Sequence, residues 1–171
     1  MSKVIPGRFT AEINESFVVF SIGMRVNNIW AVNKWLPTAS AMGPMLNALH
    51  KYPDKGFWGQ ESFYRIFPPE IVLITYWKSF EHLEGFARNT DDPHLESWRK
   101  FNKSVGTSGS VGIWHETYVV QPGQYEAMYG NMPIFGLAAA TKHIPALARH
   151  ETARRRMGGQ NEPAVPSPLN L

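Results

Sequence analysis

Apolar and polar residues follow strand patterns in four separate parts of the chain. Runs rich in β-branched and aromatic residues, bounded by turn residues, predict strands at residues 16–26, 56–64, 71–77 and 111–120. The third run is nearly all apolar, which is typical of a strand in the middle of a sheet. The pattern therefore predicts one sheet of four strands.

Apolar residues at three- and four-residue spacing predict helices between these strands. One helix covers residues 31–50, with Pro37 near its start; a second covers residues 80–88, with Ser79 as its N-cap; a third begins at Pro93. The resulting order is β-α-β-β-α-β. This order predicts an α+β domain of the ferredoxin-like kind, with a four-stranded antiparallel sheet and helices on one face.

The other face of such a sheet needs a cover. An apolar face in contact with water is an association surface, so we expect a homodimer of the dimeric α/β-barrel kind. Residues 134–149 could form one or two short helices packed on that face. We expect a single domain over residues 1–150 and a flexible tail over residues 151–171, because the tail is rich in proline, glycine and polar residues.

Composition narrows the classes of protein and site. The 171 residues can form a sizeable core, and the 13% aromatic content suits a pocket for an apolar ligand. The absence of cysteine excludes disulfides, thiolate metal sites and cysteine nucleophiles. Part of the net charge of +3 comes from Arg149 and residues 154–156, near the predicted tail, so we expect a solvated segment and no nucleic-acid partner.

The sequence also carries no recognisable targeting or spanning segment. The first nine residues lack the apolar run of a signal peptide, and no stretch approaches the roughly 18 apolar residues of a membrane span. We therefore expect a cytoplasmic protein with no membrane partner.

Three polar side chains are candidates for chemistry. His115 shares one face of its strand with Ile113 and could be a general base, a hydrogen-bond partner of a substrate, an axial haem ligand or a satisfied core histidine. His94, at a helix start that favours a neutral ring, could accept a proton, bind metal or be merely exposed. Arg25, near a strand end, could anchor an anionic or carbonyl group or simply cap the sheet.

Several common catalytic motifs are absent. The glycines between residues 106 and 112 lead into a strand, so they do not form the phosphate-binding turn that precedes a helix. The pair His115-Glu116 lacks the second histidine of a zinc protease motif, and no Gly-x-Ser-x-Gly sequence occurs.

Seven short segments carry a family resemblance: FVVFSIGMR at 17–25, KWLP at 34–37, YWKSFEHLE at 76–84, HLESW at 94–98, VGIWHETY at 111–118, YGNMP at 129–133 and FGL at 135–137. They resemble a bacterial and fungal monooxygenase-like family, typified by a monooxygenase of fumagillin biosynthesis. The resemblance covers roughly residues 7–140. A shorter likeness to spheroidene monooxygenase, a haem-dependent carotenoid enzyme, is carried by residues 56–58, 76–77 and 98–99.

The family resemblance implies the dimeric α/β-barrel fold and oxygenase chemistry. Our leading hypothesis is an oxidoreductase that inserts oxygen into a hydrophobic small molecule in an apolar pocket, with no cofactor or metal required. His115 or His94 would remove a proton, the resulting anion would react with O₂, and Arg25 would stabilise the negative charge. The side chains expected to bind the substrate are Met24, Trp35, Trp77, Trp98, Asn131, Met132 and Phe135.

Two alternatives remain open from the sequence. In one, the chain is a haem enzyme in which His115 or His94 is the axial ligand of haem b and the aromatic residues hold the porphyrin. In the other, the chain binds a small molecule without catalysis, since proteins with this fold have many functions.

Overall fold

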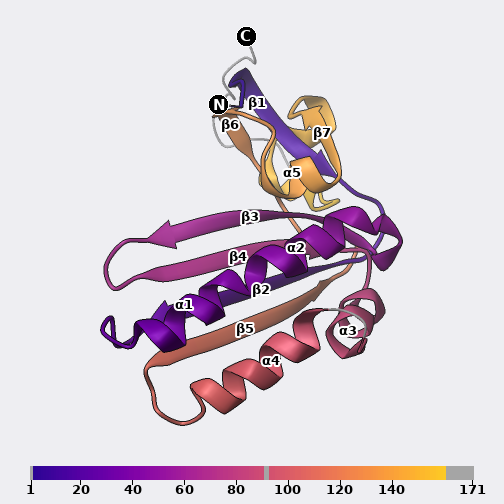
Figure 1. The fold of residues 1–171 in the computed structure, drawn as a ribbon. Helices are drawn as coiled ribbons and strands as arrows, with labels where there is room; N and C mark the ends of the chain where they lie inside the picture. Colours follow the sequence, from indigo (N-terminus) through magenta and orange to yellow (C-terminus); the bar gives the residue numbers. More distant parts are fainter. Residues whose placement is uncertain (1, 91–92, 161–171) are drawn as a thin grey trace. The chain divides into compact units, whose positions relative to one another are not determined.

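The chain forms two compact units in the computed structural model, which describes residues 2–90 and 93–160, except for the side chains of residues 93, 94 and 96. One unit, here called the sheet–helix unit, is Val18–Tyr118. The other, here called the terminal unit, combines the residues up to Phe17 with those from Val119 onward. Figure 1 shows the indigo start and the orange end of the chain in this second unit.

The sheet–helix unit is built on a four-stranded antiparallel sheet. Its strands are β2 (Phe17–Val26), β3 (Phe57–Arg65), β4 (Glu70–Trp77) and β5 (Val111–Val120). Their order across the sheet is β3-β4-β2-β5, so β4 and β2 form the central pair, and they run antiparallel. This is the strand order of a ferredoxin-like fold, so the predicted α+β fold class is confirmed.

Helices cover one face of this sheet (Figure 1). They are α1 (Val32–Ser40), α2 (Met42–Lys51), α3 (Phe80–Arg88) and α4 (Pro93–Ser104), with a short 3₁₀ turn, η1 (Pro53–Lys55), after α2. The helix predicted over residues 31–50 is divided at Ala41. Pro44 has no N–H to donate to the carbonyl of Ser40, so the α-helical hydrogen bonding is interrupted there.

The start of α3 differs in one detail from the prediction. Ser79 occupies the N-cap position, but its hydroxyl lies 2.9 Å from Nδ1 of His82 and makes no capping bond to the backbone. Hydrogen bonding to Ser79 also holds the pKa of the Glu81 carboxyl below its usual value. The ring of His82 fills the space above Gly56, where a Cβ atom would lie 2.3 Å from the imidazole.

Two apolar clusters lie between the sheet and its helices. The first consists of Val18, Leu49, Phe57, Trp77, Leu83 and Phe86. The second consists of Met24, Val26, Val105 and Val111, with Trp35 and Phe101 packed against it. Both clusters use even-numbered residues of β2, so these residues define the helix face of the sheet, and the odd-numbered residues define the far face.

The terminal unit contains a second, smaller sheet. Its strands are β1 (Ile5–Glu12), β6 (Tyr129–Met132) and β7 (Lys142–Pro145), in the order β6-β1-β7 with antiparallel pairing. Sequence analysis predicts none of these strands. Residues 134–149, expected to be helical, form only the short helix α5 (Gly136–Ala140) before the chain enters β7.

Residues 151–160, placed by the sequence in a flexible tail, are held by arginine contacts. The short helix α6 (Ala153–Arg156) follows the 3₁₀ turn η2 (Ala148–His150), and its first turn is capped by the Thr152 hydroxyl. The Arg156 side chain is only 8% exposed; it forms an ion pair with Glu126 and donates to the His150 carbonyl at 2.7 Å. This part of the predicted solvated arginine segment is therefore packed.

None of the helices in the described residues is both long and apolar enough to cross a membrane.

Candidate functional site

One row of side chains crosses the helix face of the sheet between the two apolar clusters. Gln60 on β3 pairs with Thr75 on β4, and Thr75 pairs with Phe20 on β2. The Phe20 ring then lies 5.6 Å from the imidazole of His115 on β5, at an angle of 41°. We call Gln60, Thr75, Phe20 and His115 the central row.

The hydroxyl of Thr75 is fully used within the protein. Thr75 is buried; it donates to the Phe20 carbonyl at 2.8 Å and accepts from Nε1 of Trp77 at 2.8 Å. These bonds satisfy a buried hydroxyl and the indole N–H of a buried tryptophan, which would otherwise cost about 1–3 kcal/mol each. Thr75 therefore links the backbone of β2 to the indole of Trp77, and both bonds are structural.

Gln60 has a buried acceptor that the described residues leave without a hydrogen-bond partner. This atom is its side-chain oxygen, Oε1. A ligand with an O–H or N–H group could satisfy it, so Gln60 is a candidate binding residue. Sequence alternation does not predict this position, because an irregularity between Phe57 and Gly59 shifts which residues of β3 face the helices.

His115 lies on the helix face, where strand alternation places it together with Ile113. Ile113 packs against the second apolar cluster, while the His115 ring contacts Phe20 and remains exposed. Because β5 is at the edge of the sheet, this imidazole is accessible and can accept or donate a proton.

Arg25 is on the opposite side of the sheet from His115. Its neighbours Met24 and Val26 are buried in the second cluster, so the exposed Arg25 side chain projects from the far face, where its strand partner is Glu70. Within this unit, Arg25 therefore does not share a face with His115, one of the two histidines that the sequence hypothesis allows as the base. The reason is the two-residue period of a strand.

The far face also carries aromatic residues of β5. The Trp114 indole lies against Gly23, where a Cβ atom would be 2.3 Å from Nε1, and it donates to Glu70 Oε1 at 3.4 Å. The Tyr118 hydroxyl donates to Glu116 at 2.5 Å, and this hydrogen bond, together with the negative charge of Glu116, raises the pKa of Tyr118.

His94 lies in α4, but its side chain is outside the described residues, so its predicted role stays a prediction.

The predicted binding residues of the sheet–helix unit are mostly core residues. Met24 and Trp77 are buried. Trp35 packs against the second cluster and donates its indole N–H to the Ile29 carbonyl at 3.0 Å. Trp98 is half-exposed and stacks on Phe101 with 5.6 Å between the ring centroids. Of these four side chains, Trp98 has the largest surface open to a ligand.

The remaining predicted binding residues belong to the terminal unit. Asn131 and Met132 are on β6; Asn131 has a positive φ of 53°, and its Oδ1 accepts from the Gly7 N–H at 2.9 Å. Phe135 precedes α5 as its N-cap residue. Asn131 therefore has a structural partner on β1.

A hollow of about 670 Å³ lies in the terminal unit, and several charged side chains line it. Its lining includes Glu12, Tyr125, Arg149, His150, Arg155 and Arg156. Arg149 pairs with Glu12 at 2.6 Å and donates to His150 Nε2 at 2.9 Å, while Arg155 lies 3.7 Å from Glu151. Because charged side chains line it, this hollow is not the apolar pocket that the sequence predicts.

Tyr125 lines this hollow, and its pKa departs from the usual value. Its hydroxyl accepts from the Ile13 N–H at 2.8 Å, and its ring packs edge-on against Phe17. Burial is the main cause that raises the pKa of Tyr125.

No group of three or more histidine, aspartate or glutamate side chains within the described ranges is arranged to hold a metal ion.

Residues 17–137 match the family described as Monooxygenase af470-like. The chain belongs to this family. The match covers the whole sheet–helix unit and continues to α5, and it confirms the resemblance read from the short sequence segments.

One curated relative is Monooxygenase af470 of Aspergillus fumigatus, which is 28% identical over 153 residues. The alignment covers 77% of this chain and 53% of the relative, so the chain spans about half of that protein.

Solved structures are similar at lower identity. SnoaB, a cofactor-independent oxygenase from Streptomyces nogalater, is 12% identical, with 62% of this chain and 94% of SnoaB covered and a TM-score of 0.44. A dimeric ferredoxin-like protein from an uncultured marine organism is also 12% identical, with 62% and 95% covered and a TM-score of 0.42.

Proposed function

We propose that this chain is a monooxygenase-type oxidoreductase that oxidises a hydrophobic small molecule beside the central row, with His115 as general base. Membership of the Monooxygenase af470-like family supports the reaction class. The observation that carries the site is the accessible imidazole of His115 against the Phe20 ring, between two apolar clusters. An aromatic surface beside a proton acceptor suits an apolar substrate with one acidic C–H or O–H group.

The proposed reaction needs no external reductant. His115 removes a proton from a methylene carbon made acidic by neighbouring carbonyl or aromatic groups, and the carbanion is oxidised by O₂ to a substrate peroxide that recovers the proton. Loss of the second hydrogen of that carbon, with cleavage of the O–O bond, leaves a carbonyl group on the substrate and releases water. Both hydrogens of the water come from the oxidised carbon, so atoms and electrons balance.

Gln60 is a candidate positioning residue for this reaction. Its buried Oε1 would accept a hydrogen bond from a substrate O–H or N–H, which removes the cost of a buried acceptor without a partner. Arg25 is not assigned to this step, because it projects from the far face.

We also propose that the far face mediates a homodimer. Val72, Ile74 and Tyr76 of the central strand β4 are only partly buried, and Phe63 and Tyr118 are about half-exposed. An apolar surface on a sheet favours association with a second copy. Sedimentation at micromolar concentration should give a dimer, and Ile74→Arg should give a monomer; a monomeric wild type would contradict this part of the proposal.

The test of the catalytic proposal is oxygen uptake with a panel of phenols and enolisable polycyclic ketones. His115→Gln should lower kcat by at least about 100-fold, because general-base catalysis contributes roughly 10²–10⁴-fold. His50→Gln, which changes another exposed histidine of the same unit, should leave kcat unchanged. Gln60→Leu should raise KM more than it lowers kcat.

Two results would overturn the catalytic proposal. Full activity in His115→Gln would remove His115 from the mechanism. A stoichiometric Soret band after addition of hemin, lost in His115→Gln, would replace the cofactor-free reaction by the haem alternative.

A further inference from the structure

Two loops lie side by side at one end of the sheet–helix unit. One connects β2 to α1, and the other is the hairpin turn between β3 and β4. The N–H of Val26 donates to the Pro69 carbonyl at 2.8 Å, and the adjacent pair Arg25 and Glu70 is in register. The β2–α1 loop is also held by the indole of Trp35, which donates to the Ile29 carbonyl.

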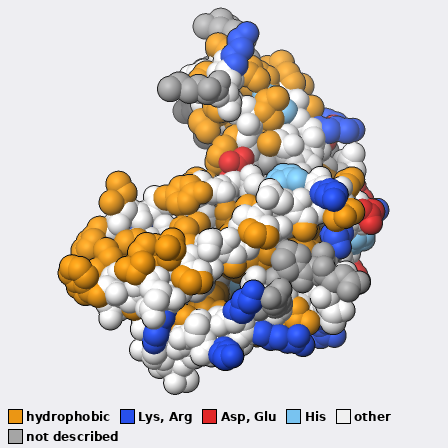
Figure 2. Space-filling view, in the orientation of Figure 1, with side chains coloured by type: hydrophobic (Ala, Val, Ile, Leu, Met, Phe, Trp, Pro, Cys, Tyr) orange, Lys and Arg blue, Asp and Glu red, His pale blue; other side chains and the backbone are white. Residues whose placement is uncertain are grey.

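These loops, and the strand end that leads into the hairpin turn, expose large apolar side chains. Ile66 is 92% exposed, Trp30 89%, Phe67 82% and Tyr64 73%. Two further side chains one helical turn apart on α1, Val32 and Leu36, are about half-exposed. We call this surface the apolar tip: Ile29, Trp30, Val32, Leu36, Tyr64, Ile66 and Phe67. Figure 2 shows hydrophobic side chains gathered over this end of the unit.

The core of the unit does not use the side chains of the apolar tip. Both apolar clusters are completed by other residues, and α1 buries no residue fully. Large contiguous apolar surfaces on soluble proteins mark contacts with other molecules. The apolar tip therefore marks an interaction surface outside the central row.

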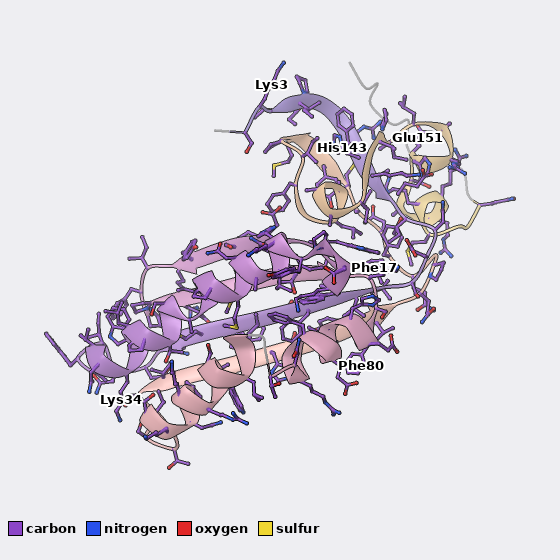
Figure 3. The ribbon with its side chains drawn as sticks, turned by 45° about the vertical axis from the view of Figure 1, so that its right-hand side comes forward. Lys3, Phe17, Lys34, Phe80, His143 and Glu151 are labelled. Atoms are coloured by element: carbon purple, nitrogen blue, oxygen red, sulfur yellow. The ribbon has the colours of Figure 1, made fainter. Side chains whose placement is uncertain are left out.

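The charges around the apolar tip are mainly positive. Residues 25–37 and 63–70 contain Arg25, Lys34 and Arg65 against a single acid, Glu70, which forms an ion pair with Arg65. The neighbouring segment 103–112, whose Ser110 carbonyl accepts from the N–H groups of residues 27 and 28, adds Lys103 and no acid. Figure 3 labels Lys34 at this end.

From these observations we infer that the apolar tip inserts into the interface of a lipid bilayer that carries anionic head groups. The most exposed residues, Ile66, Trp30 and Phe67, are at loop tips. Tryptophan, tyrosine and phenylalanine suit the boundary between head groups and acyl chains. The surrounding lysine and arginine side chains favour an anionic surface. A two-fold contact with a second copy would instead place the same positive charges opposite themselves.

This mode of binding is peripheral and is compatible with the lack of a spanning helix in the described residues. It goes beyond the proposed oxidation and does not depend on it. The expectation of no membrane partner rests on the lack of a spanning segment, whose signal in a sequence is a long apolar run. The apolar tip is formed by two segments about 35 residues apart in the sequence, which the sheet brings together.

The test is co-sedimentation of the full chain with vesicles at about 0.1 M salt. The protein should sediment with vesicles of phosphatidylcholine containing about 30% phosphatidylserine, and much less with phosphatidylcholine alone. Ile66→Ser combined with Phe67→Ser should lower the partition coefficient at least tenfold, and Lys34→Glu severalfold. The fluorescence of the wild type should shift to the blue on binding, and most of this shift should be lost in Trp30→Phe.

Phe80→Ser is the matched control, because Phe80 is exposed and follows β4 at its other end. It should bind vesicles as the wild type does, and thermal melts should show that all variants are folded. Absence of binding to the anionic vesicles would overturn the inference, as would equal loss in Phe80→Ser. A second copy would be the partner of the tip if the wild type bound no vesicles and the Ile66/Phe67 double variant converted a dimer into a monomer. That result would also overturn the inference.

Discussion

The two units of this chain differ in how they are assembled and in what stabilises them. The sheet–helix unit is one continuous segment, Val18–Tyr118, with two apolar clusters under its helices. The terminal unit joins both ends of the chain, and its sheet pairs β1 with β6 and β7, more than 110 residues away. Arginine–carboxylate pairs, such as Arg156 with Glu126, are prominent in it.

Local sequence patterns predict a unit only where its contacts are formed by neighbouring elements. In the sheet–helix unit each predicted strand or helix packs against others from the same continuous segment. In the terminal unit a strand such as β1 is stabilised by residues far along the chain, so its own sequence carries little signal. Substitutions in each unit should therefore affect mainly the interactions of that unit.

The largest loss of stability is expected for Trp77→Ala in the first apolar cluster. Trp77 is 2% exposed, its ring lies 5.3 Å from that of Phe57, and its indole N–H bonds to Thr75. Its removal should lower the free energy of unfolding by about 3–5 kcal/mol, because it leaves a large cavity in the core. Urea denaturation would measure this, with hydrogen exchange to show that protection is lost mainly within residues 18–118.

Trp98→Ala is the control for that change, because Trp98 is half-exposed on α4. It should cost at most about 1 kcal/mol. Equal effects of the two substitutions, or equal loss of protection in both units, would contradict the separate apolar core assigned to the sheet–helix unit.

A smaller effect, confined to the terminal unit, is expected for Arg156→Ala. The change removes the ion pair with Glu126 and the bonds to the carbonyls of His150 and Glu151, and should cost about 2 kcal/mol. Limited proteolysis should then cleave within residues 148–160. Arg154→Ala, which removes an exposed arginine of the same short helix, should leave the cleavage rate unchanged; faster cleavage in both variants would indicate a weakly held segment.

The smallest loss of stability is expected for Tyr125→Phe. The hydroxyl bonds to the Ile13 N–H, so its loss should cost about 1–2 kcal/mol at pH 8. Burial raises the pKa of Tyr125 in the folded state, so the folded protein retains this proton at a pH where the unfolded chain loses it. The wild type should therefore lose stability as the pH rises above about 10, the ordinary tyrosine pKa.

The phenylalanine variant cannot titrate at this position. The difference in free energy of unfolding between the wild type and Tyr125→Phe should therefore narrow from pH 8 to pH 10.5. Thermal unfolding at both pH values measures it. A difference that stays constant would show that Tyr125 has the same pKa in the folded and unfolded states.

The candidate site was only partly predictable from the sequence. Alternation along β5 correctly places His115 on the face that carries Ile113, because the strand is regular there. The same rule, applied to β2, would have separated Arg25 from the helix face once Met24 was known to be buried. Gln60 could not be found, because the irregularity in β3 changes the alternation just before it.

The elements of the sheet–helix unit and the family follow from local sequence, because strand and helix periodicity and the short segments between residues 17 and 137 are local properties. Which side chains meet depends on the tertiary structure. It paired β1 with distant strands, ordered the arginines after residue 148, separated Arg25 from His115, and joined two loops into the apolar tip. These outcomes depend on sheet register and on contacts between residues far apart in the chain, which no local pattern specifies.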